Sequence, residues 1–454
     1  MTMLPTISAC LVTWRRPDNL RRIVERLVQE DFIGEVLVWR NDLAVALHLP
    51  WPKVRIIDSP TNVICHGRYL CAEQAAYPLV YVQDDDVLVH DIASLVRQFQ
   101  ADPTRIHFNL SDWHYARRDR HIYGESHSAL IGWGAVFAKE WLSVLQLLPD
   151  SVRSSPLYLR EADQYFTMLQ RRHHAPHRGA LTQLDGHSTT GVALWCAPEH
   201  WRMSSLAVRD ALRVIRTSAG SSLPPAWHVV VTCYNYARYL AEAVESVMLN
   251  DADYELTIVD DASPDETPQV ARDLQARYPH VHYLRLPQRG RVSRARNVGI
   301  GTLDSAFVAL LDADDRFGPD YLFEAGRVLS GGADVANPDA LLFGAESGRW
   351  STPAETTLPM LLRHNSVHYC SAFRRDCWVE VGGFDESIED WEDYDFWIRT
   401  VARGARVRTV AGDHFHYRRH EHSKSSENHG RRDQLRRMLR AKHEHLFALW
   451  SAPD

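Results

Sequence analysis

Two mostly apolar runs in this chain each end in a cluster of aspartates. Residues 79–83 lead into Asp84–Asp86, and residues 307–311 lead into Asp312–Asp315. Adjacent carboxylates repel one another, and the end of a buried strand desolvates them, so such a cluster lowers stability unless a cation neutralises it. Oxygen ligands of this kind suit Mg²⁺ or Mn²⁺. The alternative for either cluster is a solvated turn whose aspartates cap a helix, but two clusters in equivalent places favour a cation.

The two halves of the chain share one plan of elements. Each opens with a β-branched run, Ile7–Val12 or Val229–Thr232, followed by an amphipathic helix at 18–29 or 238–248. The further predicted strands are Glu35–Trp39, Val54–Asp58 and Leu79–Gln83 in the first half, and Glu255–Val259, Val281–Leu286 and Ala306–Leu311 in the second. Apolar strands that alternate with helices are typical of an α/β fold with mostly parallel sheets. Ligands bind such sheets beyond the carboxyl ends of the strands, where both aspartate clusters are expected.

With 454 residues, the chain exceeds the usual size of one domain. The only Ser/Gly/Pro-rich stretch between long patterned regions is 218–225, so we predict a linker at 218–227. The predicted domains are residues 1–217 and 228–454. Residues 331–357 are expected to form a loop that contributes to specificity.

Charge and cysteine content exclude some classes of protein. A formal charge of −7 gives no reason to expect a nucleic-acid partner, because phosphate backbones select basic surfaces. Seven cysteines without a CxxC pair argue against a disulfide framework and favour a reducing compartment. Residues 1–14 have no basic region before their apolar residues, which predicts a first strand instead of a signal peptide. No apolar run approaches the ~18 residues that span a bilayer, so we expect a soluble, cytoplasmic protein.

Six short strings follow one another within residues 228–420. They are Val230–Asn235, Val259–Ser263, Arg294–Gly299, Asp312–Asp315, Gly382–Asp385 and Trp391–Asp395. Each string alone is weak, but in this order they resemble an inverting glycosyltransferase of family 2 with the GT-A fold. The resemblance implies a nucleotide-diphosphate sugar as donor and a hydroxyl group as acceptor.

The same resemblance implies a set of donor-binding residues. They are Thr232, Asp260, Asp261, Arg294, Arg296 and Asp312. The first three would hold the base and ribose, since a carboxylate accepts hydrogen bonds from a base N–H or a ribose hydroxyl. The two arginines would lie near the diphosphate. The alternatives are helix capping for the aspartates and plain surface positions for the arginines.

Three residues of the second half are candidate ligands of Mn²⁺ or Mg²⁺. By resemblance, Asp312 and Asp314 would flank the metal, and Asp314 would be the direct ligand. His416 stands where some GT-A enzymes place a third ligand. Its alternative is a hydrogen-bonded structural histidine.

Asp393 is the predicted catalytic base. The apolar spacing of Tyr394, Trp397, Ile398 and Val401 predicts an amphipathic helix with Asp393 in its first turn. The helix dipole lowers the pKa of an anion there, so burial would have to offset that effect. The resemblance implies that Asp393 takes the proton of the attacking hydroxyl. Glu392 is the alternative base, and plain helix capping is the alternative for either residue.

The first half is more loosely similar to the exostosin-type (family 64) retaining glycosyltransferases. The strings that carry the similarity are Glu35–Asn41, Ser59–Asn62, Gly67–Tyr69, Asp84–Asp86, Ser128–Ala135 and Glu161–Asp163. Two positions depart from that family. Ala162-Asp163 stands where a Glu-Asp pair is common, and His66-Gly67-Arg68 stands where an Asn-Asn-Arg run is common.

The similarity implies a second site in the first half. Its metal ligands would be Asp86 and Asp84, and the residues near the nucleotide would be Asn62, Arg68, Asp84 and Asp85. Asp163 would stabilise oxocarbenium-like charge on the reacting sugar, by the electrostatic logic of glycosidases. The alternative for Asp163 is to cap the helix that begins there.

Two further stretches have both a functional and a structural interpretation. His173, His174 and His177 stand among three arginines, which favours a solvated polar turn over a metal site. Residues 431–450 read as one basic amphipathic helix, a type that can lie on an anionic membrane. The alternative is a helix that packs its apolar face on its own domain.

Together these patterns predict a bifunctional enzyme made of two tandem GT-A domains that extends a polysaccharide or other glycoconjugate, with a glycan or lipid-linked glycan as acceptor. The first site would retain and the second would invert the anomeric configuration. The alternatives are a single-activity enzyme whose first half binds the acceptor, and a non-catalytic sugar- or nucleotide-binding protein.

Overall fold

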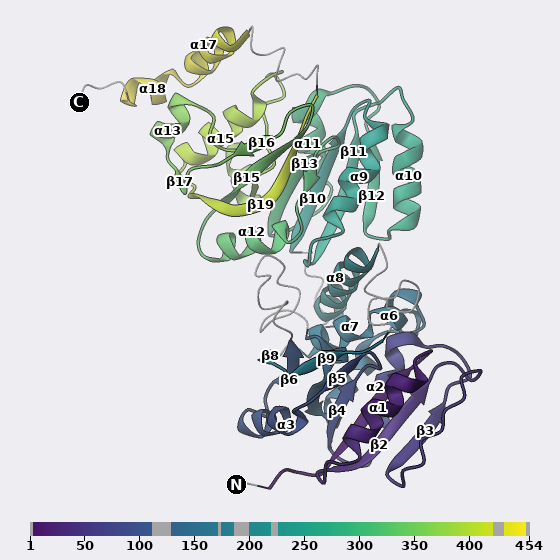
Figure 1. The fold of residues 1–454 in the computed structure, drawn as a ribbon. Coiled ribbons are helices and arrows are strands. Elements are labelled where there is room, and N and C mark those ends of the chain that lie inside the picture. Colours follow the sequence, from purple (N-terminus) through teal and green to yellow (C-terminus); the bar gives the residue numbers. More distant parts are fainter. Residues whose placement is uncertain are drawn as a thin grey trace. The chain divides into compact units, whose positions relative to one another are not determined.

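The computed structural model describes residues 3–110, 129–170, 174–185, 199–218, 226–420 and 431–450. The chain divides into two compact units, residues 1–221 and 222–454, each with a large sheet of its own (Figure 1). The division falls inside the Ser/Gly/Pro-rich stretch, of which residues 219–225 lie outside the described part of the chain.

The N-terminal unit is built on a seven-stranded sheet of order β3-β2-β1-β4-β7-β6-β8. Its strands are β1 (Ile7–Thr13), β2 (Ile33–Arg40), β3 (Val54–Asp58), β4 (Leu79–Gln83), β6 (Ile106–Leu110), β7 (Ala135–Ala138) and β8 (His174–Arg178). The first four in the order run parallel, β7 is antiparallel to both neighbours, and β8 is parallel to β6. A separate pair joins β5 (Val87–Val89) to β9 (Leu181–Gln183).

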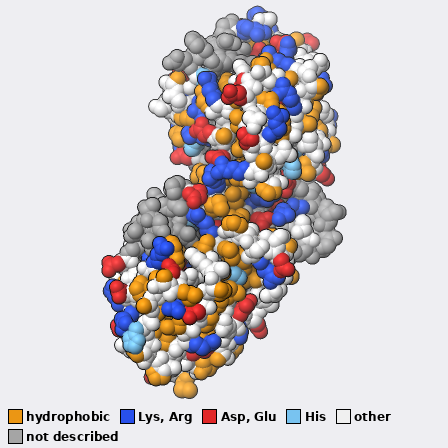
Figure 2. Space-filling model, turned by 90° about the vertical axis from the view of Figure 1, so that its right-hand side faces the viewer, with side chains coloured by type: hydrophobic (Ala, Val, Ile, Leu, Met, Phe, Trp, Pro, Cys, Tyr) orange, Lys and Arg blue, Asp and Glu red, His pale blue; other side chains and the backbone are white. Residues whose placement is uncertain are grey.

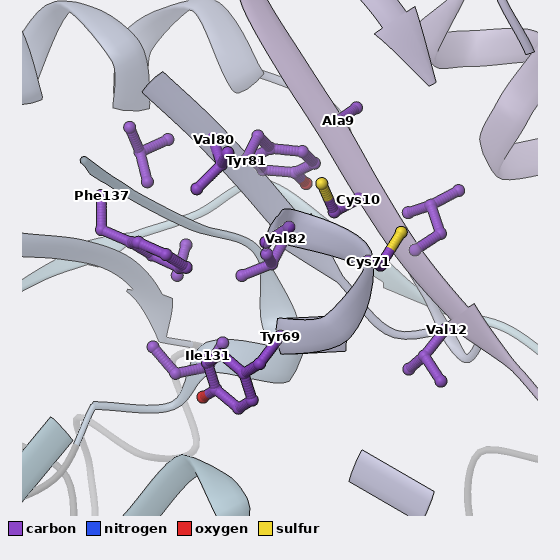
Figure 3. Close-up of a cluster of buried hydrophobic side chains, with 14 of the residues drawn as sticks. Ala9, Cys10, Val12, Tyr69, Cys71, Val80, Tyr81, Val82, Ile131 and Phe137 are labelled. Atoms are coloured by element: carbon purple, nitrogen blue, oxygen red, sulfur yellow. The ribbon is translucent and has the colours of Figure 1, made fainter. Parts of the chain in front are cut away.

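Helices pack on this sheet and enclose its core. They are α1 (Pro17–Leu27), α2 (Gly67–Glu73), α3 (Ile92–Ala101), α5 (Asp150–Arg153), α6 (Pro156–Arg160), α7 (Ala162–Leu169) and α8 (His200–Ser218), with 3-10 turns at Ile64–His66, Ile131–Trp133 and Lys139–Leu147. β1 and β4 are buried along their whole length because they are central strands covered on both faces. Figure 3 shows Val80 and Val82 of β4 among aromatic side chains such as Phe137.

The C-terminal unit has a ten-stranded sheet whose main path is β12-β11-β10-β13-β18-β15-β19-β14. Its strands are β10 (Trp227–Cys233), β11 (Tyr254–Asp260), β12 (Val281–Arg285), β13 (Phe307–Asp312), β14 (Arg316–Phe317), β15 (Val335–Gly344), β16 (Gly348–Trp350), β17 (Glu355–Thr356), β18 (Ala372–Arg374) and β19 (Val407–Arg419). Its helices are α9 (Ala237–Val247), α10 (Thr267–Arg277), α11 (Arg291–Gly301), α12 (Tyr321–Ser330), α13 (Leu358–Arg363), α14 (Arg375–Val381), α15 (Glu392–Ala402), α17 (Arg432–Lys442) and α18 (Glu444–Trp450).

The two sheets repeat one another over seven strands. From β12 to β13 the strands are parallel, β18 is antiparallel to both neighbours, and β15 is parallel to β19. The strands of the N-terminal sheet, in the order β3-β2-β1-β4-β7-β6-β8, have the same relative directions. In both sheets, the strand that ends in the aspartate cluster lies beside the first strand of its unit.

Two stretches expected to be loops or turns are strands. The segment 331–357 contains β15, β16 and β17, although Asn337-Pro338-Asp339 reads as a turn. Pro338 fits because the pairing of β15 with β19 shifts register there, where a proline breaks no regular ladder. Residues 174–178 form β8, with Pro176 on the edge of the sheet. His174 is buried there and His177 stacks on His107, while His173 lies outside the described residues.

The segment 431–450 forms two helices instead of one. The break comes at His443, which is buried and hydrogen-bonded to Asp395 on α15. Leu435 and Leu439 are buried, and Leu446 and Phe447 pack against the core of the same unit. These four apolar side chains are therefore covered by the unit itself, while Met438 on the same helix is exposed. Contact with a membrane surface stays a prediction.

Figure 2 shows basic and acidic side chains mixed over the face that it draws. Among the described helices, none has both the length and the apolar character required to cross a bilayer.

Candidate active sites

The carboxyl ends of β10 and β13 carry the centre of the C-terminal site. Thr232 and Asp312 pair in register on these neighbouring parallel strands. The Thr232 hydroxyl donates to Asp312 Oδ1 at 2.7 Å, and the side chain of Asp312 stays 32% exposed. The strand end therefore holds Asp312 in place while leaving part of its carboxylate open.

Arg296 projects from α11 into the same place and is almost completely buried. Its Nη2 lies 3.2 Å from Asp312 Oδ1, and its Nη1 donates to Glu392 Oε1 at 2.9 Å. The ring of Tyr369 lies 4.9 Å from the guanidinium. The terminal nitrogens of Arg296 are engaged by protein carboxylates, and its place near a donor diphosphate stays a prediction. Arg294 is partly exposed on the same helix.

Glu392 and Asp393 begin α15, as the apolar spacing predicted. Trp391 precedes them with a positive φ of 65°, and its own side chain does not cap the helix. Backbone N–H groups of Asp393 and Tyr394 oppose the rise that burial causes in the pKa of Asp393, so capping stays an alternative for this residue. Asn365 donates to Asp393 Oδ2 at 3.1 Å. Burial raises the pKa of Asp393, and the Arg296 charge opposes that rise. Burial also raises the pKa of Glu392 to about 7, against the same arginine.

Asp260 ends β11, Asp261 follows it directly, and both are buried. Asp260 accepts hydrogen bonds from the Ser263 amide, Tyr283 and Arg285, the last at 2.7 Å. Asp261 accepts from the amides of Gly290 and Arg291 at the start of α11. In this structure both carboxylates organise the loops around the site, and contact with a nucleotide stays a prediction.

The histidine beside Asp314 is His420, not His416. His420 Nε2 lies 2.8 Å from Asp314 Oδ2 and stacks on Tyr236. His416 instead lies against Phe343 and pairs with Arg316 across β14 and β19. His416 lies within β19, whereas His420 is the first residue after it, and this is the histidine that reaches the aspartate.

A divalent cation fits the residues at this point. Carboxylate oxygen and imidazole nitrogen are donors that Mn²⁺ accepts, and Asp314 and His420 supply one of each with Asp312 nearby. No complete set of three or more His, Cys, Asp or Glu ligands is formed within the described ranges.

The N-terminal unit brings Arg68, Asp84 and Asp163 together. Arg68, on α2, is almost completely buried. Its Nη2 lies 2.5 Å from Asp84 Oδ1, and its Nη1 lies 2.6 Å from Asp163 Oδ2. Tyr69 donates to Asp163 Oδ1 at 2.7 Å, so Asp163 is held by two partners and does not cap α7. Burial raises the pKa of Asp163, and it raises that of Asp84 to about 7.

Close packing fixes the Asp84 side of this arrangement. A Cβ at position 132 would collide with the Asp84 carboxylate, so Gly132 is required there. Asp85 accepts from the Thr13 hydroxyl at 2.8 Å and pairs with Arg16 at 2.7 Å. Arg16 also lies 3.7 Å from Asp86.

Asn62 is less closely tied to this group. It is exposed and accepts from the Ile64 amide at 2.9 Å, where Ile64 has a positive φ of 51°. It therefore shapes its own turn, and its contact with a nucleotide stays a prediction. Sequence reasoning gave no site role to Arg16, Tyr69 or Tyr369. Only Tyr69 stands in one of the strings that carry the family resemblance, Gly67–Tyr69, and there Arg68 was the residue singled out.

Comparison with known proteins assigns a family to part of the chain. Residues 228–377 match the model of glycosyl transferase family 2. The succinoglycan biosynthesis protein ExoO of Rhizobium meliloti is 31% identical over 210 residues, which cover 42% of this chain and 60% of that protein. The minor teichoic acid biosynthesis protein GgaA of Bacillus subtilis is 24% identical over 213 residues, covering 43% and 48%. The uncharacterized protein y4gI of Sinorhizobium fredii is 28% identical over 268 residues, covering 57% and 29%.

The matched region therefore spans between 29% and 60% of the length of these relatives. Among solved structures, residues 1–349 of S. aureus TarS align with 42% of this chain and 60% of that one, at 19% identity and a TM-score of 0.38.

Proposed function

Because residues 228–377 carry a family 2 glycosyltransferase domain, we propose that the C-terminal unit transfers a sugar from a nucleotide-diphosphate donor to a hydroxyl group of a growing polysaccharide or other glycoconjugate, with inversion. Relatives named for succinoglycan and teichoic acid biosynthesis support this acceptor class. The observation that carries the proposal is the arrangement of Asp312 at a strand end and Glu392 and Asp393 at a helix start, with Arg296 bonded to both Asp312 and Glu392.

Asp393 is the proposed base. A single displacement forms the bond from the acceptor oxygen to the anomeric carbon as the bond to the diphosphate breaks. Asp393 takes the proton of the acceptor hydroxyl, and the diphosphate leaves with the bonding electrons. The nearby Arg296 charge favours the ionised carboxylate that this task requires, against the effect of burial.

Asp314 and His420, with Asp312 beside them, are the proposed holders of Mn²⁺ or Mg²⁺. Such an ion neutralises charge on the departing diphosphate. Thr232 and the loops ordered by Asp260 and Asp261 are proposed to receive the nucleotide, with Arg294 near the diphosphate.

We also propose a second sugar-transfer site in the N-terminal unit, which would make the chain bifunctional. It is supported by the repeated strand order and by the group of Arg68, Asp84 and Asp163, which resembles that of Arg296, Asp312 and Glu392. Retention at this site, with Asp86 and Asp84 as metal ligands and Asp163 at the sugar, rests on the similarity to exostosin-type enzymes. The alternative is a unit that binds the acceptor without catalysis.

The test is donor hydrolysis by the full chain with Mn²⁺, across UDP-, GDP- and dTDP-sugars. We expect Asp314→Ala to abolish turnover of one donor, because a ligand of the ion that neutralises the diphosphate is lost. If Asp86→Ala abolishes turnover of a different donor, both sites are active. Loss with Asp314→Ala alone would support the single-activity alternative, and turnover unaffected by either change would refute the metal assignment.

A further inference from the structure

Arg296 is a buried cation surrounded by carboxylates. Its side chain is 2% exposed, and it contacts Asp312 on one side and Glu392 on the other. A buried guanidinium without partners is very costly, and Nη1 and Nη2 both have carboxylate partners here. Within the described residues, Nε has no hydrogen-bond partner, so the two terminal nitrogens hold the guanidinium in position.

These contacts join two elements with different tasks in the proposed reaction. Asp312 ends β13 beside Thr232, on the side where the donor is proposed to bind. Glu392 begins α15 and is adjacent to the proposed base. The planar fork of an arginine makes two directed contacts at once, so it fixes the distance between the strand end and the helix start.

The same arrangement occurs a second time in the chain. Arg68 precedes Asp84 by 16 residues and Asp163 by 95, and Arg296 precedes Asp312 by 16 and Glu392 by 96. Each arginine lies on the helix that precedes the aspartate-ended strand, and each reaches the first turn of a later helix. The two units thus share a bridge in which the arginine and the strand-end aspartate recur, while the carboxylate at the helix start is an aspartate in one unit and a glutamate in the other.

We propose that Arg296 is a positioning residue that sets the place of the Asp393 helix start relative to the donor-binding strand end, and that Arg68 is its counterpart in the N-terminal unit. The proposal rests on the function proposed above for the C-terminal unit. Arg296 contacts neither donor nor acceptor in this role. It acts through Glu392 and Asp312.

The substitution Arg296→Lys separates this role from simple charge balance. Arg296→Lys keeps the positive charge but has a single nitrogen, which cannot serve Asp312 and Glu392 together. A misplacement of about 1 Å between reacting groups can cost about 100-fold in rate. We therefore expect a loss of about 100-fold in kcat, with a much smaller change in the donor KM.

The experiment measures kcat and donor KM for hydrolysis by the full chain with Mn²⁺, on a donor of the UDP, GDP and dTDP panel that the wild type turns over. Arg399→Lys is the matched control, because Arg399 pairs with Asp395 on α15 and contacts neither Asp312 nor Glu392. Glu392→Gln, alone and combined with Arg296→Lys, tests whether Arg296 and Glu392 act through one bridge. If they do, the fold-loss in kcat of the double variant is smaller than the product of the two single fold-losses.

An unchanged kcat in folded Arg296→Lys, or a rise in KM alone, overturns the positioning role while leaving the proposed function intact. Equal losses in Arg296→Lys and Arg399→Lys also overturn it, since they would reflect general loosening of α15. If Arg296→Lys does not fold, Glu392→Gln and Asp312→Asn are compared with the double variant that carries both changes. A loss in kcat of the double variant equal to the product of the two single losses decides against the bridge. A wild type that turns over no donor removes both the proposed function and this role.

Discussion

Asp393 and Glu392 are adjacent carboxylates in one buried helix start, and their ionisation is shared with Arg296. Each negative charge disfavours the other, and burial disfavours both, so the pKa of each carboxyl lies above its ordinary value. Their titration belongs to the pair more than to either residue. A base at Asp393 must be ionised to work, which makes activity depend on pH.

We expect kcat to rise with pH through an acid limb above the ordinary carboxylate range, because burial raises the pKa of Asp393 against the opposing charge of Arg296. Glu392→Gln removes the neighbouring negative charge, so we expect that limb to move to lower pH. Asp393→Asn should abolish transfer across the whole range. The measurement is the pH dependence of donor turnover in the three proteins, and a limb that Glu392→Gln moves to higher pH would contradict the assignment.

The site residues show where sequence reasoning succeeds and where it stops. The places of Asp312 and Asp314 at a strand end and of Asp393 at a helix start could be predicted, because local patterns define those elements. Their roles in a site stay predictions. His420 was missed in favour of His416, because the contact with Asp314 spans 106 residues and depends on how the chain leaves β19. The bridging role of Arg296 was missed for the same reason, since Glu392 is 96 residues away.

At the scale of elements, most predicted strands of both halves lie within one or two residues of their places in the structure. Val54–Asp58 and Leu79–Gln83 coincide with β3 and β4. The misses, β8 and β15, both contain proline and polar residues. Tertiary pairing with β6 and with β19 decides their conformation, and a local pattern does not contain that information.

Helix α17 offers a test at this scale. Asp395 on α15 is fully buried, and it is bonded by Arg399, Lys442 and His443, so the end of α17 is tied to the helix that carries the proposed base. Leu439 is 2% exposed on the packed face of α17, and the neighbouring Met438 is 37% exposed.

We expect Leu439→Ala to lower the free energy of unfolding of the C-terminal unit by about 2–5 kcal/mol, because it removes a buried side chain and leaves a cavity. Met438→Ala, the matched control, should change it by less than about 0.5 kcal/mol. Urea denaturation of the full chain measures both. Equal, small effects would mean that this face of α17 is open in solution, as the membrane-surface interpretation requires.

At the scale of the whole molecule, the chain consists of two units that each enclose a core. The buried residues around β1 and β4 form one cluster, and those around Phe373, Phe396 and Trp397 belong to another. Phe137 and Phe396 are each completely buried, one in each core (Figure 3 for Phe137).

Because each unit has its own core, we expect a core substitution to destabilise only the unit that contains it. Phe137→Ala should destabilise the N-terminal unit by about 3–5 kcal/mol, and Phe396→Ala should destabilise the C-terminal unit by a similar amount. Calorimetry of the full chain should therefore show two unfolding transitions, of which each variant shifts one to lower temperature and leaves the other unchanged.

At a temperature where both units are folded, Phe137→Ala should keep wild-type turnover of the donor that depends on Asp314, because every residue proposed for that site lies in the C-terminal unit. A single transition that both substitutions shift equally would mean that the units unfold as one, and the two sites could not then be studied independently.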